Sequence, residues 1–253
     1  MKSLAPKSSL EDLHVDRLLR TLLSDDWIFK TGVGGMLVAG SIVAGLYSYM
    51  CIPIVVALWA LIIGYSLRCM RYKMMNPDCK LPDWGDWGDL FLSGITWVAL
   101  QTFLWVMIAG IAFGIMILCS AYAIGTKNPV ESNIDVILGC LLIGFIYFMF
   151  SVLSAYLMVN FAQEENTGAG MAFRKVARRI LAEPLKYLSA YFLAVGIQWA
   201  SFIVPCITIV GVFLLPSAFF IGQAASAAVL GRAWASTAST ENEGDKKKLD
   251  KAS

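Results

Sequence analysis

Charged residues and histidine are scarce in this chain of 253 residues. Only 15% of the residues are charged, against roughly 25% in an ordinary soluble domain, and His14 is the single histidine. A His-rich zinc site, a His-based catalytic triad and a pair of haem ligands therefore cannot be assembled within the apolar segments. This composition excludes a soluble globular enzyme.

Motifs that hold phosphates, metals or redox-active thiols are also missing. The sequence contains no Walker A or G-x-G-x-x-G loop, and no two of its six cysteines form a C-x-x-C pair. The net charge is only +2, so there is no large basic field to gather nucleic acid. We expect no enzymatic activity, no cofactor, no resident metal and no nucleic-acid partner.

Apolar residues, in contrast, make up 58% of the chain, and the mean hydropathy is +0.68. Six apolar runs are long enough to cross a hydrocarbon core of about 30 Å as helices. The predicted spans are residues 33–50, 52–67, 95–123, 134–162, 187–207 and 209–230. The sequence therefore predicts an all-α integral membrane bundle of six transmembrane helices arranged as three hairpins.

The basic residues predict the orientation of this bundle. Every Lys and Arg except Lys127 falls on one side of the six predicted spans. Cytoplasmic segments carry such an excess of basic residues, so both termini are expected in the cytoplasm. No cleavable signal peptide precedes the first run, and we expect a multi-pass protein of a prokaryotic cytoplasmic (inner) membrane.

Two flanking segments differ from the six-span domain, which we place at residues 24–235. Residues 1–23 are predicted to form an amphipathic cytoplasmic helix that lies on the membrane surface or against a partner helix. Residues 236–253 have almost no apolar side chains and predict a disordered cytoplasmic tail.

A doubled Asp-Trp-Gly unit, which precedes the third span, is the most distinctive string. It comprises Asp83, Trp84, Asp86, Trp87 and Asp89. One interpretation is an interfacial anchor, because Trp favours the headgroup level and Asp complements a helix N-terminus. The other is an acidic patch that binds a cation or the basic loop after the second span. That loop carries Arg68, Arg71 and Lys73.

A second candidate surface lies between the fourth and fifth spans. Residues 171–182 predict a short amphipathic helix with four basic side chains on its polar face. These are Arg174, Lys175, Arg178 and Arg179. The charge either only sets topology or makes a specific site for anionic lipid or a partner protein.

Few polar side chains interrupt the predicted spans. No Lys, Arg, Glu or His lies at a span centre, which argues against a proton-driven pump. Gln101, Gln198 and Gln223 are the clear polar residues. They either form hydrogen bonds between helices or line a path for a polar solute.

Several strings resemble a known family. They are Asp25-Asp26-Trp27 before Gly34-Gly35, Gly64-Tyr65-Ser66-Leu67-Arg68, the Leu81-Pro82-Asp83-Trp84 string and Pro184-Leu185-Lys186-Tyr187. Together they resemble the prokaryotic membrane-protein family called domain of unknown function 4013, over about residues 24–234. The resemblance implies a multi-pass membrane domain with no assigned activity, so it supports the architecture and adds no mechanism.

Two functional hypotheses follow from these patterns. The first is a non-enzymatic scaffold or accessory subunit of a membrane assembly, because amphipathic and Trp-rich segments gather on the cytoplasmic side. The alternative is a channel or carrier for a small neutral or amphiphilic solute, with the three glutamines as path residues. The expected partners are anionic membrane lipids and either a membrane protein or a second copy of the chain.

Overall fold

The computed structural model describes residues 26–47, 49–76, 80–125, 129–207 and 209–249. The predicted amphipathic helix at residues 1–23 lies outside these ranges. Within them every regular element is a helix. In chain order the elements are α2 (Trp27–Tyr47), η1 (Tyr49–Cys51), α3 (Ile52–Met75), α4 (Trp87–Gly125), α5 (Pro129–Glu164), α6 (Thr167–Gly170), α7 (Phe173–Ala182), α8 (Pro184–Cys206) and α9 (Ile209–Leu249).

Six of the described helices are long and apolar enough to cross a membrane: α2, α3, α4, α5, α8 and α9. Each contains all or most of one predicted span, so the all-α six-helix architecture is confirmed. Proline marks several of the boundaries. Pro129 and Pro184 are the first residues of α5 and α8, where the missing amide donor has no intrahelical partner to lose.

The last part of the chain forms a longer helix than the sequence predicts. Pro216 lies inside α9, which loses one backbone hydrogen bond there and continues. The helix also runs to Leu249, whereas a disordered tail was predicted from residue 236. Extending an existing helix avoids the cost of nucleating a new one.

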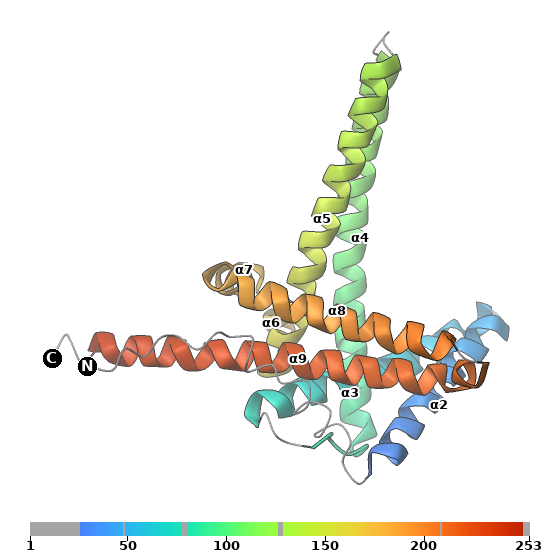
Figure 1. Cartoon of the computed structure of the whole chain (residues 1–253), viewed down its shortest axis with the longest axis vertical. Helices are drawn as coiled ribbons and strands as arrows, with labels where there is room; N and C mark the ends of the chain where they lie inside the picture. The colour runs from blue at the N-terminus through green and yellow to red at the C-terminus, as the bar shows by residue number, and fades with distance from the viewer. Residues whose placement is uncertain (1–25, 48, 77–79, 126–128, 208, 250–253) are drawn as a thin grey trace.

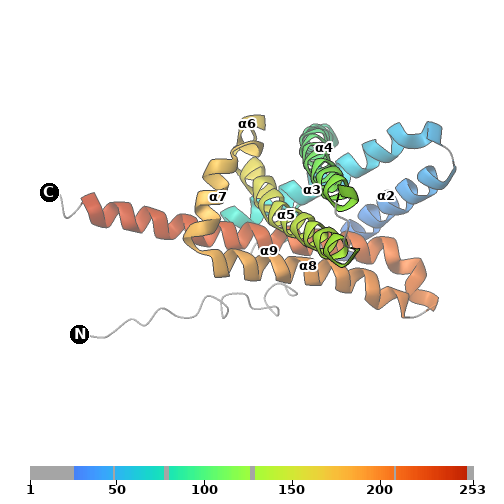
Figure 2. The same cartoon turned by 90° about the horizontal axis from the view of Figure 1, so that it is seen from above.

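The six long helices pair as three antiparallel hairpins: α2 with α3, α4 with α5, and α8 with α9. The α4–α5 hairpin rises steeply from a layer formed by the other four helices (Figure 1). Seen from above, this hairpin is almost end-on, and α3 passes beside its base (Figure 2). The start of α4 and the end of α5 therefore meet the other hairpins, while their far ends project away.

Glycines allow the closest helix approaches. A Cβ on Gly64 of α3 would lie 1.9 Å from the carbonyl oxygen of Leu90, and one on Gly94 of α4 would lie 1.7 Å from that of Ala60. The two backbones are thus in direct contact, the type of packing that small residues permit between membrane helices. Gly34 of α2 likewise receives the ring of Phe220 from α9.

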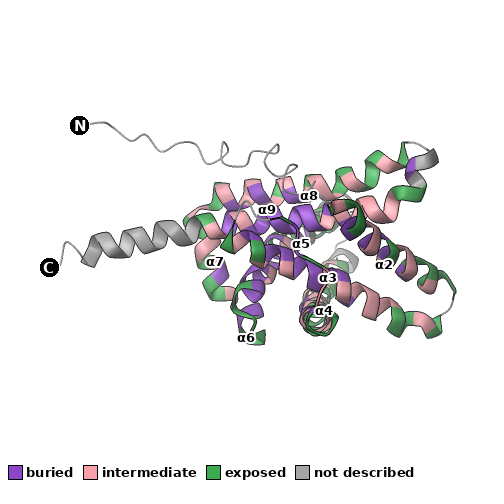
Figure 3. Cartoon of the chain, turned by 90° about the horizontal axis from the view of Figure 1, so that it is seen from below, coloured by how far each residue is buried: buried purple, intermediate pink, exposed green. Residues whose placement is uncertain are grey.

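The buried residues gather where α9, α3 and α5 meet (Figure 3). The fully buried side chains there include Tyr65, Tyr156, Tyr187 and Trp234. In contrast, only 6% of the most apolar window of α4 is buried. An apolar helix surface that is exposed in this way suits contact with lipid.

We expect Gly94→Ala to destabilise the protein by about 2 kcal/mol, because the added methyl overlaps the Ala60 carbonyl. Gly110→Ala is the matched control on the same helix, since no atom lies within 4 Å of a Cβ built there. The free energy of unfolding in mixed detergent micelles measures both. Equal stability of the two variants would contradict the close α3–α4 crossing.

Candidate functional site

The Asp-Trp-Gly segment before α4 is held by the first turn of α2. Lys30 donates from Nζ to the Leu81 carbonyl oxygen at 2.8 Å and forms an ion pair with Oδ1 of Asp83 at 2.6 Å. Nε1 of Trp84 donates a hydrogen bond to the Lys30 carbonyl oxygen at 2.9 Å. The segment and α2, which are more than 50 residues apart in the chain, are therefore joined by three polar contacts.

The Lys30–Asp83 ion pair is buried on one side only. The side chain of Lys30 is 8% exposed, whereas that of Asp83 is 89% exposed. The hydrogen bond and positive charge from Lys30 hold the pKa of the Asp83 carboxyl below its usual range. Lys30 thus supplies a buried cation whose counter-ion faces water.

Aromatic stacking fixes the same segment against α3 and α9. The Trp84 ring stacks on Tyr65 with centroids 4.2 Å apart and on Phe220 at 5.5 Å. Trp87 also stacks on Trp84, with centroids 5.4 Å apart. The Tyr65 hydroxyl also donates to the Pro82 carbonyl oxygen at 2.9 Å. Trp84 is therefore the centre of the docked segment, and Trp87 lies at its exposed edge.

Arg68 of α3 binds the end of the segment. Its guanidinium donates to the Gly85 carbonyl oxygen at 2.6 Å and pairs with Oδ2 of Asp89 at 3.1 Å. Between them, the backbone of Asp86 takes a positive φ of 50°, which turns the chain into α4. The three aspartates have different surroundings: Asp83 pairs with Lys30, Asp89 pairs with Arg68 of the predicted basic loop, and Asp86 occupies the turn.

The other basic residues of the predicted loop have different roles. Arg71 donates from Nε to the Ala162 carbonyl oxygen at 3.1 Å and pairs with Oε1 of Glu165 at 2.6 Å, which links α3 to the end of α5. Lys73 is buried. Sequence reasoning counted Lys30 only as a topological charge. Lys30 precedes the first predicted span, which begins at residue 33, so no local signal in the sequence indicated its partner.

The predicted basic helix is present as α7, and its apolar side packs inward with Val176 fully buried. Arg179 donates to the Trp234 carbonyl oxygen at 2.9 Å, and its guanidinium carbon lies 3.9 Å from the centre of the Trp234 ring. Trp234 in turn donates to Oε1 of Gln163 on α5 at 2.6 Å. Lys175 forms an ion pair with Glu164. The end of α5, α7 and α9 are therefore linked through Arg179 and Trp234.

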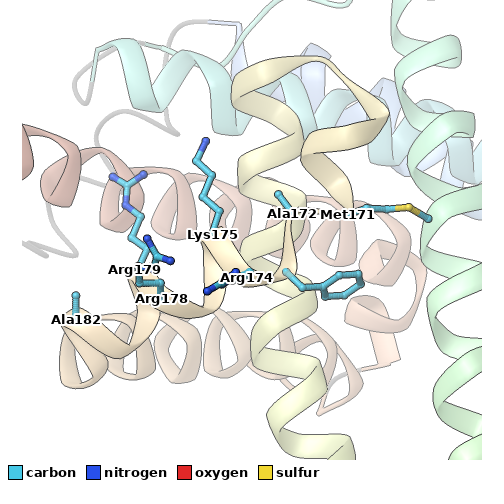
Figure 4. A pocket seen from close by; sticks show the side chains of 8 residues that line it. Met171, Ala172, Arg174, Lys175, Arg178, Arg179 and Ala182 are labelled. Carbon is cyan, nitrogen blue, oxygen red and sulfur yellow. The ribbon is translucent and has the colours of Figure 1, made fainter.

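A cavity of about 850 Å³ runs along α7 (Figure 4). Its lining combines basic side chains with apolar or small ones. The residues are Met171, Ala172, Phe173, Arg174, Lys175, Arg178, Arg179 and Ala182. All four basic residues predicted for this helix therefore border one concave surface.

The three glutamines do not come together. Gln101 of α4 exchanges hydrogen bonds of 2.8 and 3.0 Å with Ser154 of α5. The amide oxygen and nitrogen of Gln198 on α8 are buried and make no hydrogen bond within the described part of the chain. Gln223 is half-buried on α9. Gln101 therefore has the interhelical role that was one of its two interpretations.

Comparison with known families decides the relationship that the sequence strings suggested. Residues 45–215 match the family described as protein of unknown function (DUF4013). The chain belongs to the DUF4013 family. Comparison with curated proteins gives no match, and neither does comparison with solved structures.

The DUF4013 region contains both candidate surfaces, the Asp-Trp-Gly segment and α7. The side chains that bind these surfaces from α2 and from the later part of α9 lie outside it. They are Lys30, Phe220 and Trp234. In this chain, residues on both sides of the family region therefore contact its two candidate surfaces.

We expect Trp84→Ala to destabilise the protein by about 3 kcal/mol, because it removes three aromatic contacts and the hydrogen bond to Lys30. Trp87→Ala is the matched control in the second Asp-Trp-Gly unit. Its side chain is 44% exposed, so the cost should stay under about 1 kcal/mol. Unfolding in mixed micelles measures the difference, and equal losses would contradict the central position of Trp84.

Proposed function

We propose that the protein is a non-enzymatic scaffold or accessory subunit of an assembly in a prokaryotic cytoplasmic membrane, with both termini in the cytoplasm. The observation that carries this proposal is a polar network at the basic ends of the helices. We use that term for the contacts made by Lys30, Arg68, Arg71, Tyr156, Arg179 and Trp234.

The polar network reaches all six long helices. Lys30 and Arg68 connect α2 and α3 to the start of α4, and Arg71 connects α3 to α5. Tyr156 of α5 donates to the Tyr187 carbonyl oxygen of α8 at 2.6 Å, and Trp234 of α9 bonds to α5. Most of these bonds end on backbone carbonyls, which do not change charge. Such a network suits a platform that holds surface segments in place.

The basic residues of the polar network support its location on the cytoplasmic side of the membrane. Four of the network's six residues are Lys or Arg, and α7 adds exposed Arg174 and Arg178 beside it. Basic side chains concentrate on the cytoplasmic side of membrane proteins because translocating them is unfavourable. The α5 end, with Glu164 and Glu165, lies on that side through its pairs with Lys175 and Arg71.

The polar side chains inside the spans favour a scaffold over a carrier. The hydrogen bonds between Gln101 and Ser154 occupy the side chain that would have to face a solute. The amide of Gln198 is covered by packing, and Gln198 lies close to Gly222 of α9. A solute path requires polar groups open to a shared cavity.

Native mass spectrometry of the intact particle after mild extraction tests the proposal. The full-length chain should carry a second protein in fixed stoichiometry. A chain that lacks residues 1–23, the predicted amphipathic docking helix, should lose that protein. It should still be extracted as a folded particle of its own mass.

A particle that contains only this chain and a bound solute would contradict the scaffold role. Reconstitution in liposomes then provides the opposing measurement. Solute flux that exceeds protein-free vesicles and disappears in Gln198→Leu would establish the carrier. Retention of the second protein by the truncated chain would refute the docking role of residues 1–23.

A further inference from the structure

The basic side chains of α7 divide into two pairs. Arg179 is held by Trp234 and Lys175 by Glu164, as described above. For Arg174 and Arg178, no hydrogen bond or ion pair is formed with any described residue. Both side chains are exposed, and both line the cavity along α7. The cavity therefore carries two uncompensated positive charges.

These two arginines are spaced to bind one anion. Positions four residues apart lie on one face of a helix, with Cβ atoms about 6 Å from each other. Figure 4 shows Arg174 and Arg178 on α7 among the side chains that line the cavity. A guanidinium binds phosphate oxygens in a bidentate manner, so two of them can share a single phosphate group.

Exposed apolar side chains flank this pair. Leu181 is 76% exposed, lies three residues after Arg178 and thus shares its helix face, and Met171 at the other end of the cavity is 46% exposed. Leu185, at the start of α8, is 83% exposed. Basic and large apolar side chains exposed together are typical of a helix that lies at a membrane interface.

The position of α7 in the fold agrees with a location at the membrane interface. The helix is tied to the ends of α5 and α9 through Lys175 and Arg179, and its inner face packs through Val176. It therefore lies at the basic ends of the long helices, which are the ends expected near lipid headgroups.

We propose that the cavity along α7 binds the phosphate headgroup of an anionic phospholipid, with Arg174 and Arg178 on the phosphate and Met171 against the start of an acyl chain. Charge complementarity selects the anion, and the adjacent exposed apolar side chains select a lipid over a free phosphate. The bound lipid would fix the depth of α7 in the interface. The site requires no partner protein and is therefore independent of the scaffold role.

The test measures lipid binding to the purified full-length protein in detergent by native mass spectrometry. The probes are dioleoyl-phosphatidylglycerol and dioleoyl-phosphatidylcholine. We expect phosphatidylglycerol to bind more tightly than phosphatidylcholine. Arg174→Gln combined with Arg178→Gln should weaken phosphatidylglycerol binding roughly 30-fold, which corresponds to the loss of two cations near a membrane surface.

The matched control is Lys80→Gln combined with Lys186→Gln, which removes the same charge from the same predicted side at residues that do not line the cavity. Its affinity for phosphatidylglycerol should stay within about threefold of the unchanged protein. Equal weakening by both double variants would overturn the proposal, because it would indicate diffuse attraction. So would equal affinity of the unchanged protein for the two lipids.

A third variant separates lipid from free anion and does not touch the arginines. Met171→Ser should weaken phosphatidylglycerol binding and leave competition by soluble glycerol phosphate unchanged. If glycerol phosphate displaces the lipid at equal concentration, the cavity is a soluble-anion site and the lipid assignment is wrong. The Met171→Ser variant and the competition by glycerol phosphate both use proteins that keep Arg174 and Arg178. These two measurements therefore still test the proposal if the double arginine variant does not fold.

Discussion

The docking of Trp84 between α2, α3 and α9 is the interaction on which the arrangement of the helices depends. Its ring stacks on Tyr65 and Phe220, and its indole nitrogen bonds to the backbone of Lys30. Because Trp84 lies just before α4, this contact sets where α4 begins. The glycine crossing of Gly64 with the α4 backbone then brings α3 and α4 together at close range.

The polar network extends this docking across the remaining helices. Long apolar helices gain little from hydrophobic contact with each other inside lipid, so specific hydrogen bonds and close packing decide which pairs associate. Arg71 links α3 to α5, and Arg179 with Trp234 links α7 to α9. The contacts lie at one set of helix ends, and the far part of the α4–α5 hairpin projects away from the other helices. This distribution supports the proposed role as a platform at one face of the membrane.

The sequence predicted the elements well and their partners poorly. Apolar runs indicate the spans because hydropathy is a local property, and the 3.6-residue period of residues 171–182 indicates α7 for the same reason. The acidic residues show the limit. The basic loop was one predicted partner of these residues, and its Arg68 does pair with Asp89, whereas local spacing does not encode the pairing of Asp83 with Lys30. The close approach at Gly94 and the engagement of Arg179 by Trp234 likewise depend on residues distant in the chain.

A double-mutant cycle between Tyr65 and Trp84 tests the central contact most directly. Tyr65→Leu, Trp84→Leu and the double variant of the full-length chain are compared by their free energies of unfolding in mixed micelles. Stacked rings 4.2 Å apart should give a coupling energy of about 1 kcal/mol. A coupling energy of zero would show that Trp84 does not dock on α3. It would contradict the helix arrangement and the scaffold proposal that is based on it.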